Sequence, residues 1–169
     1  MKLSKVERLM LVNQYLILER LYPDEKEFYA NNRKAIEEGF ELHYSDLFAG
    51  ISDETLTEEE CREVLDILNM FRAITFSYQK LQDKTGIDEY YIKFHGFDLN
   101  DEYEGKRVIY ARYFINDLDR FEELKYGKGY ADCNSHDLMM DSYRMMLHKW
   151  NCIQNKYELS KDDILKIIE

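Results

Sequence analysis

Apolar side chains return every three or four residues over much of the chain, which is the period of an amphipathic helix. The first such segment covers residues 5–21, and Ser4 and Glu7 stand at the spacing of a capping box at its start. Pro23 ends this segment, and Gly39 is placed to end a second helix that follows it. The pattern therefore predicts an N-terminal helical hairpin.

The longest predicted helix occupies the middle of the chain. Thr57 and Glu60 form a second capping-box pair, and apolar residues then continue at helical spacing to Leu81. Residues 90–95 alternate only weakly, and a single strand without a partner is not stable, so we expect an irregular crossing there. A last helix is predicted to begin at Ser160, which stands three residues before an aspartate in another capping pattern.

Two further helices are predicted between these elements. Asp98 or Asn100 is expected to cap a helix that continues at three- and four-residue steps to Phe121. After a glycine-containing loop, Ser135 is expected to open another helix that continues to Ile153. With these two helices, most of the chain is predicted to be helical.

Composition supports an all-α fold. The 169 residues include seven glycines and one proline, too few for the tight turns of a many-stranded sandwich or barrel. We predict a multihelical single domain over 1–169, with the N-terminal hairpin, two long central helices and little or no sheet. Within it, a subdivision into a helical hairpin at 1–50 and a helical core at 51–169 is possible.

The charge balance argues against partners that need a basic surface. There are 34 acidic and 23 basic side chains, which give a net charge of −11, and the basic residues form no stripe. Because a negative field repels phosphate backbones and anionic lipid headgroups, we predict no nucleic-acid partner and no membrane partner. The N-terminus lacks the apolar run of a signal peptide, and three widely spaced cysteines suit free thiols, so we expect a cytoplasmic location.

One arrangement of cysteine and histidine has ligand-like spacing. Cys133 precedes His136 by three residues, and His148 precedes Cys152 by four. A continuous helix over 137–153 would separate the two histidines by about 18 Å, whereas all ligands of one zinc ion lie within about 2.3 Å of it. We therefore predict no metal and no cofactor, and leave open only adventitious binding at the His148 and Cys152 pair.

The sequence contains no residue constellation of a known reaction, and we predict no catalytic residues. Cys61 lies one turn into a helix behind three consecutive glutamates, whose charges oppose formation of a thiolate. We interpret it as a buried helical cysteine. Whether the protein is an enzyme stays open, although a non-enzymatic role fits the sequence better.

Aromatic residues are in excess, with 14 tyrosines and nine phenylalanines. Two explanations remain open: a thick internal core, or a surface for self-association or for a partner, since Tyr and Met are enriched at interfaces. The turn at Gly96-Phe97-Asp98 is either a structural joint or a polar ligand site with the aspartate as acceptor. The candidate interaction or ligand residues are Phe97, Asp98, Tyr143, Met146 and Trp150.

Several motifs occur in one order along the chain: Glu7-Arg8-Leu9 through Asn13-Gln14-Tyr15, Cys61-Arg62, Leu81-Gln82-Asp83, Phe94-His95-Gly96-Phe97-Asp98, and Tyr143-Arg144-Met145-Met146-Leu147 with Trp150 and Leu159-Ser160. With them the chain resembles the YfbU family of bacterial proteins along nearly its whole length. The resemblance implies an all-helical, cytoplasmic protein and carries over no catalytic residues. Asn13 and Gln14 are polar in a largely apolar helix, so we expect them to form buried hydrogen bonds between helices.

Two functions from different classes fit these observations. The one we favour is a non-enzymatic protein-interaction or regulatory module that forms a homo-oligomer, a dimer or higher, with any other protein partner unknown. The alternative is a small-molecule-binding protein or small hydrolase, with a pocket lined by Tyr and Met near the Gly96-Phe97-Asp98 turn. Oligomeric state and ligand stabilisation distinguish the two.

Overall fold

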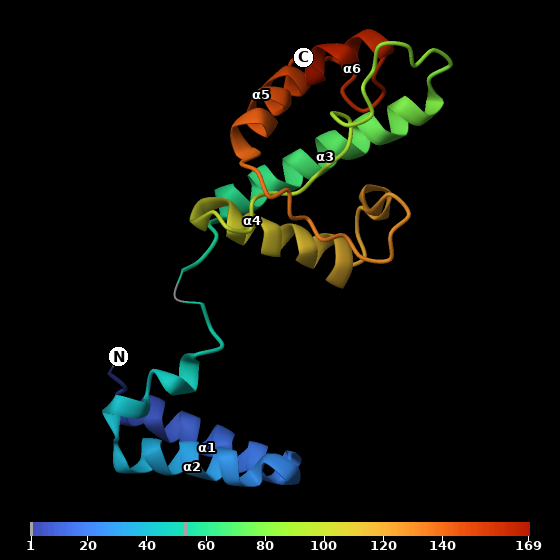
Figure 1. Ribbon diagram of the computed structural model, residues 1–169. Coiled ribbons are helices and arrows are strands. Elements are labelled where there is room, and N and C mark those ends of the chain that lie inside the picture. Colours follow the sequence, from blue (N-terminus) through green and yellow to red (C-terminus); the bar gives the residue numbers. More distant parts are fainter. Residues whose placement is uncertain (1, 53) are drawn as a thin grey trace. The chain divides into compact units, whose positions relative to one another are not determined.

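The computed structural model describes residues 2–52 and 54–169 and divides the chain into two compact units, Met1–Thr55 and Leu56–Glu169 (Figure 1). The all-α prediction is confirmed. Over the described residues there is no strand, and the single β-type contact is an isolated parallel bridge between Phe97 and Asn134.

The first unit contains the predicted helical hairpin. Its helices α1 (Lys5–Leu21) and α2 (Lys26–Glu38) pack together along their length. The capping box of Ser4 and Glu7 is present, and Gly39 ends α2 in the left-handed conformation that glycine adopts readily. Three short 3-10 turns complete the unit: Pro23–Glu25, Glu41–His43 and Asp46–Phe48.

Few side chains are buried within the first unit. The guanidinium of Arg8 on α1 donates to the backbone carbonyls of Ile36, at 2.7 Å, and Glu37, at 2.6 Å. These carbonyls belong to the last turn of α2, where a helix leaves its acceptors without internal partners. Among the described residues of this unit, only Ile36 and Tyr44 are fully buried.

The second unit is built around one long helix. Its helices are α3 (Glu58–Lys80), α4 (Glu102–Arg112), α5 (Met140–Asn151) and α6 (Lys161–Ile168). α4, α5 and α6 all pack against α3 (Figure 1). The predicted caps Thr57 and Ser160 are confirmed, each with a complete capping box. Of the predicted central helices, only α3 is long, at 23 residues.

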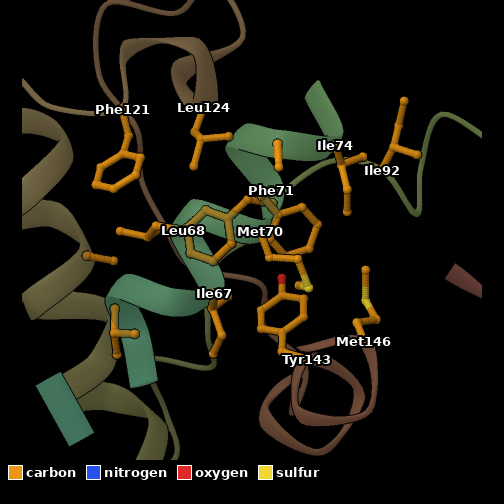
Figure 2. Packing of buried hydrophobic residues seen from close by; sticks show 14 of the residues in the cluster. Ile67, Leu68, Met70, Phe71, Ile74, Ile92, Phe121, Leu124, Tyr143 and Met146 are labelled. Carbon is orange, nitrogen blue, oxygen red and sulfur yellow. The ribbon is translucent and has the colours of Figure 1, made fainter. Parts of the chain in front are cut away.

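The hydrophobic core of the second unit surrounds α3. Figure 2 shows side chains of α3 meeting residues of α5 and of the connecting loops. At its centre four aromatic rings, Phe71, Phe94, Phe97 and Tyr143, contact one another with centroids 5.1 to 5.8 Å apart. Part of the aromatic excess is therefore core packing, which contributes hydrophobic area and ring contacts together.

The start of α4 differs from the prediction. Its cap is Asp101, whose carboxylate accepts the N–H groups of Tyr103 at 3.0 Å and Glu104 at 2.8 Å. Asp98 caps nothing in the helix and instead accepts the N–H of Asn100 at 2.9 Å. An aspartate that folds back on its own turn cannot also reach the first helical N–H groups.

The end of α4 is also earlier than predicted. The helix passes into a π-helical turn, Tyr113–Asp117, which the N–H of Leu118 closes by donating to the carbonyl of Tyr113 at 2.9 Å. Phe121, the predicted last helical residue, has a φ of 55° and so cannot continue a right-handed helix. A short 3-10 turn, Glu122–Lys125, follows.

α5 begins at Met140, five residues after the predicted opening at Ser135. The N–H of Ser135 donates to the carbonyl of Phe97 at 3.0 Å, and His136 has a φ of 60°. A long-range partner therefore holds this segment out of the helix. At its other end α5 stops at Asn151, two residues short of the predicted Ile153.

The expectation of buried hydrogen bonds from Asn13 and Gln14 is wrong within the helical hairpin. Both side chains are exposed. α2 packs on another face of α1, so neither polar residue lies between the two helices of the hairpin.

Gly96 is expected to tolerate no side chain. Its φ is 96°, and a Cβ built there would lie 2.1 Å from the backbone carbonyl of Cys133. We expect Gly96→Ala to lower the free energy of unfolding by at least about 3 kcal/mol, because both the left-handed conformation and the clash act together. Urea denaturation followed by circular dichroism measures this.

The matched control is Gly86→Ala, at a glycine with a φ of 83° and open space around it. There only the conformational penalty applies, about 1 kcal/mol. Equal losses in the two variants would contradict the role assigned to the contact with Cys133.

Candidate functional site

A buried carboxylate connects three segments of the second unit. Glu104 on α4 is 2% exposed and accepts the N–H of Asp98 at 2.8 Å and those of Met139 and Met140 at 2.8 and 2.7 Å. The last two donors lie at the N-terminus of α5, where the helix dipole also favours a negative charge. Glu104 thus attaches both the 96–98 turn and the start of α5 to α4.

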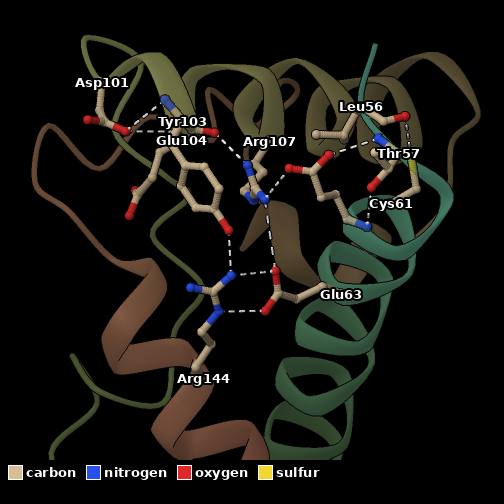
Figure 3. A network of polar contacts seen from close by, with 10 residues as sticks. Leu56, Thr57, Cys61, Glu63, Asp101, Tyr103, Glu104, Arg107 and Arg144 are labelled. Atoms are coloured by element: carbon tan, nitrogen blue, oxygen red, sulfur yellow. Dashed lines mark hydrogen bonds and ion pairs between the residues drawn. The ribbon is translucent and has the colours of Figure 1, made fainter.

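A buried guanidinium lies one turn further along the same helix. Arg107 is 1% exposed, and its amino groups donate to Glu60 of α3 at 2.9 Å and to the carbonyl of Tyr103 at 2.6 Å (Figure 3). Glu63 of α3 lies 4.0 Å from Arg107 and forms a two-point ion pair with Arg144 of α5, at 2.6 and 3.0 Å. This network ties α3, α4 and α5 together at one end of the core.

The sequence contains a signal for Glu104 that lies outside any motif of known chemistry. Glu104, Val108, Ala111 and Ile115 recur at three- and four-residue steps and are all buried. A glutamate on the apolar face of a predicted helix has to find partners inside the protein. Its partners, however, come from loop backbone far along the chain, which no periodicity locates.

The turn at Gly96-Phe97-Asp98 acts as a joint between two distant segments. The N–H of Phe97 donates to the carbonyl of Cys133 at 3.0 Å, and the side-chain oxygen of Asn134 accepts the N–H of Leu99 at 3.1 Å. The segment that follows α4 is thereby fixed against the turn. Asp98 is partly buried, with its backbone held by the carboxylate described above.

The other predicted candidates lie in the core. Phe97 is 0%, Tyr143 1% and Trp150 2% exposed, and Met146 is also buried. Tyr143 accepts the backbone N–H of His95 at 3.1 Å, and burial raises its pKa well above the ordinary value of a tyrosine. A tyrosine that stays protonated at neutral pH acts here as a fixed hydrogen-bonding group. These four side chains form no continuous surface with Asp98.

A cavity of about 470 Å³ opens beside the turn. Three segments line it: 93–95, the 124–128 loop and 131–134. Tyr126 forms part of its wall and accepts the N–H of Phe94 at 2.6 Å, while burial raises the pKa of Tyr126 to about 12. The cavity walls are therefore cross-linked by backbone-to-side-chain hydrogen bonds.

The cysteines and histidines do not assemble into a reactive group. Burial raises the pKa of Cys133 to about 12, so its thiol stays protonated, whereas Cys61 is partly buried and Cys152 exposed. Within 2–52 and 54–169, no three His, Cys, Asp or Glu side chains lie close enough to hold a metal ion. No described helix has the length and hydropathy needed to cross a bilayer.

An apolar surface lies on the first unit. The outer stripe of α1 comprises six exposed side chains at helical spacing: Val6, Leu9, Met10, Leu16, Ile17 and Leu21. Each is between 44% and 67% exposed, and Asn13 and Arg20 lie within the same face. The face toward α2 carries a second apolar set, Leu11, Val12, Tyr15 and Leu18. α1 is therefore apolar on two faces, and only the face toward α2 is covered within the first unit.

The role of Glu104 can be tested by removing its charge. Glu104→Gln places an amide NH₂ among three N–H donors, so we expect the free energy of unfolding to fall by about 2 to 4 kcal/mol. Glu102→Gln, an exposed neighbour in the same helical turn, is the control and should change stability by less than about 0.5 kcal/mol. Indistinguishable urea midpoints for the two variants would refute the assignment.

Two comparisons identify the family. A family model described as the YfbU domain matches residues 1–169. The chain is also 38% identical over 170 residues to UPF0304 protein MJECS11 of Methanocaldococcus jannaschii, with 98% of each chain covered. Because the match runs from the capped first helix to the last, the chain belongs to the YfbU family.

Proposed function

We propose that this protein is a self-associating, non-catalytic interaction module, and that two copies pair through the outer stripe of α1. The observation that carries the proposal is the exposure of six aliphatic side chains on a helix none of whose residues is fully buried. Soluble proteins rarely leave a largely apolar helix face of this kind in water.

The area of the stripe fits a dimer interface. Six aliphatic side chains with these exposures present about 600 Å² of apolar surface in water. A pair of copies would bury about 1,200 Å² in total, which reaches the lower range of specific protein interfaces. A second copy of the chain also presents the same surface at the same concentration, as an isologous two-fold contact requires.

The order of residues along the stripe favours an antiparallel pair. With a two-fold axis at Asn13, Leu9 faces Ile17 of the other copy and Met10 faces Leu16. The amide of Asn13 then faces the Asn13 amide of the other copy. One amide can both donate a hydrogen bond to another amide and accept one from it. A central polar pair of this kind fixes the register of paired helices.

Charge also favours the antiparallel direction. A parallel pair would place Arg20 beside Arg20. In the antiparallel pair Arg20 faces the first turn of the other helix, which contains Glu7. The Ser4 N–H and hydroxyl groups donate to Glu7 and hold the pKa of that carboxyl below its usual value, so it is charged at neutral pH. The antiparallel pair therefore keeps the two Arg20 side chains apart and brings each one near the helix turn that contains the negatively charged Glu7.

The first test places a charge in the stripe. Ile17→Asp buries a carboxylate in each half of the interface, and we expect it to weaken self-association at least 100-fold. Multi-angle light scattering at about 50 µM, well above a micromolar dissociation constant, should give twice 20.5 kDa for the parent chain and 20.5 kDa for the variant. Leu138→Asp, at a leucine that is 69% exposed in the second unit, is the control and should stay dimeric.

Two results overturn the proposal: a parent chain that is strictly monomeric, or a dimer that Ile17→Asp leaves intact. Circular dichroism checks that the variant keeps its helices. Because the Ile17 side chain points away from α2, its replacement removes little packing within the chain.

The second test concerns direction and uses cysteine cross-linking after Cys152→Ser removes the exposed thiol. Asn13→Cys lies on the proposed axis and should form a disulfide-linked dimer under mild oxidation. Arg20→Cys should not, because its two copies would lie about 21 Å apart along the helices, whereas a disulfide needs Cα atoms within about 7 Å. If both variants cross-link, the pair is parallel. If neither variant cross-links, the proposed interface is refuted.

A further inference from the structure

The cavity beside the 96–98 turn has a charge unlike that of the rest of the molecule. Its lining includes Lys93, Lys125 and Lys128 together with His95, against one acidic residue, Asp132. The chain as a whole carries an excess of 11 acidic side chains. A basic cavity in an acidic protein is a local site rather than part of a general surface field.

Neighbouring groups divide these lysines into two kinds. Lys125 is 2.7 Å from Asp119, and Lys93 is 3.6 Å from Glu89, so each has a nearby carboxylate. The acid of the lining, Asp132, is itself paired with Arg112. With these pairs balanced, Lys128 supplies the net positive charge of the cavity, and its exposed side chain is free to move toward a ligand.

The remaining lining is apolar and aromatic. Phe94, Leu124, Ala131 and Tyr126 contribute carbon surface, and Asn134 adds a polar group. Buried apolar residues with a few polar groups are the usual composition of a small-molecule site, and about 470 Å³ lies within the usual range of volumes. The lining therefore suits a molecule with an anionic group and an apolar body.

The backbone around the cavity is held in an unusual conformation. Tyr126 and Cys133 of its wall have φ values of 50° and 53°, although neither is glycine. A long-range hydrogen bond holds each of these residues. The hydroxyl of Tyr126 accepts the N–H of Phe94, and the carbonyl of Cys133 accepts the N–H of Phe97. Strained backbone that is maintained by its surroundings is concentrated at binding sites. Such a cavity is formed before any ligand arrives.

We propose that this cavity binds a small organic anion, in which a phosphate or carboxylate group faces Lys128 and an apolar or aromatic body lies against Phe94 and Leu124. This site lies within the second unit and does not depend on pairing through α1. The predicted ligand is distinct from a nucleic acid or a membrane, because a single unpaired lysine beside a cavity cannot replace an extended basic surface.

Phenyl phosphate, inorganic phosphate and benzoate are the probes. We expect 10 mM phenyl phosphate to raise the unfolding temperature by about 3 to 5 °C over sodium chloride of equal ionic strength, because ligands that bind the folded state stabilise it. Inorganic phosphate should bind at least tenfold more weakly, since it lacks the ring. Isothermal titration gives the affinities, and a comparison with benzoate distinguishes a phosphate preference from a carboxylate preference.

Lys128→Glu should abolish the stabilisation by phenyl phosphate. Lys166→Glu, at an exposed lysine of α6, makes the same change in net charge away from the cavity and should leave the response intact. Both positions are exposed, so both variants are expected to fold. The proposal is overturned if neither phenyl phosphate nor benzoate stabilises the parent protein more than chloride does, or if Lys128→Glu responds like the parent.

Discussion

The second unit depends on how α4 accommodates two buried charges. Glu104 and Arg107 are one turn apart and almost completely buried, yet they do not neutralise each other by direct pairing in the described structure. Each instead takes partners from other elements: backbone N–H groups of the 98 turn and α5 for the carboxylate, and an acid of α3 for the guanidinium (Figure 3). Since an unpaired buried charge is strongly unfavourable, these elements must assemble in one arrangement.

That arrangement also positions the cavity. With the 98 turn held by Glu104, the backbone of Phe97 bonds to that of Cys133, and the 119–136 segment is folded back beside the turn. Asn116 in the π-helical turn exchanges hydrogen bonds with the backbone of Ala131, and three non-glycine residues of the loop between them have left-handed φ values. The same bonds form the walls of the basic cavity, so a structural joint and a ligand site can share one turn.

The first unit follows a different principle. It fully buries only Ile36 and Tyr44 among its described side chains, and α1 is apolar on the face toward α2 and on the outer stripe. Asn13, expected from the sequence to bond between helices, lies instead in the middle of that stripe. In the proposed antiparallel pair, this asparagine lies at the two-fold axis and its amide bonds to the same amide of the other copy. Part of the aromatic excess is core packing, and many other aromatic side chains of the described residues are exposed, whereas the outer stripe of α1 itself carries no aromatic ring.

The sequence by itself determined the all-α class, the hairpin, and the starts of α1, α3 and α6, because capping boxes and apolar periodicity act over a few residues. Ser4, Thr57 and Ser160 each satisfy N–H groups within their own first turn, so no distant contact is needed to place them. Only the tertiary structure decided where α5 begins, because Phe97 bonds through its backbone to Cys133 and Ser135, and Glu104 accepts the N–H groups of Met139 and Met140, each across more than 30 residues. The cavity was likewise hidden, since its lysines come from separate segments that meet only when those bonds have formed.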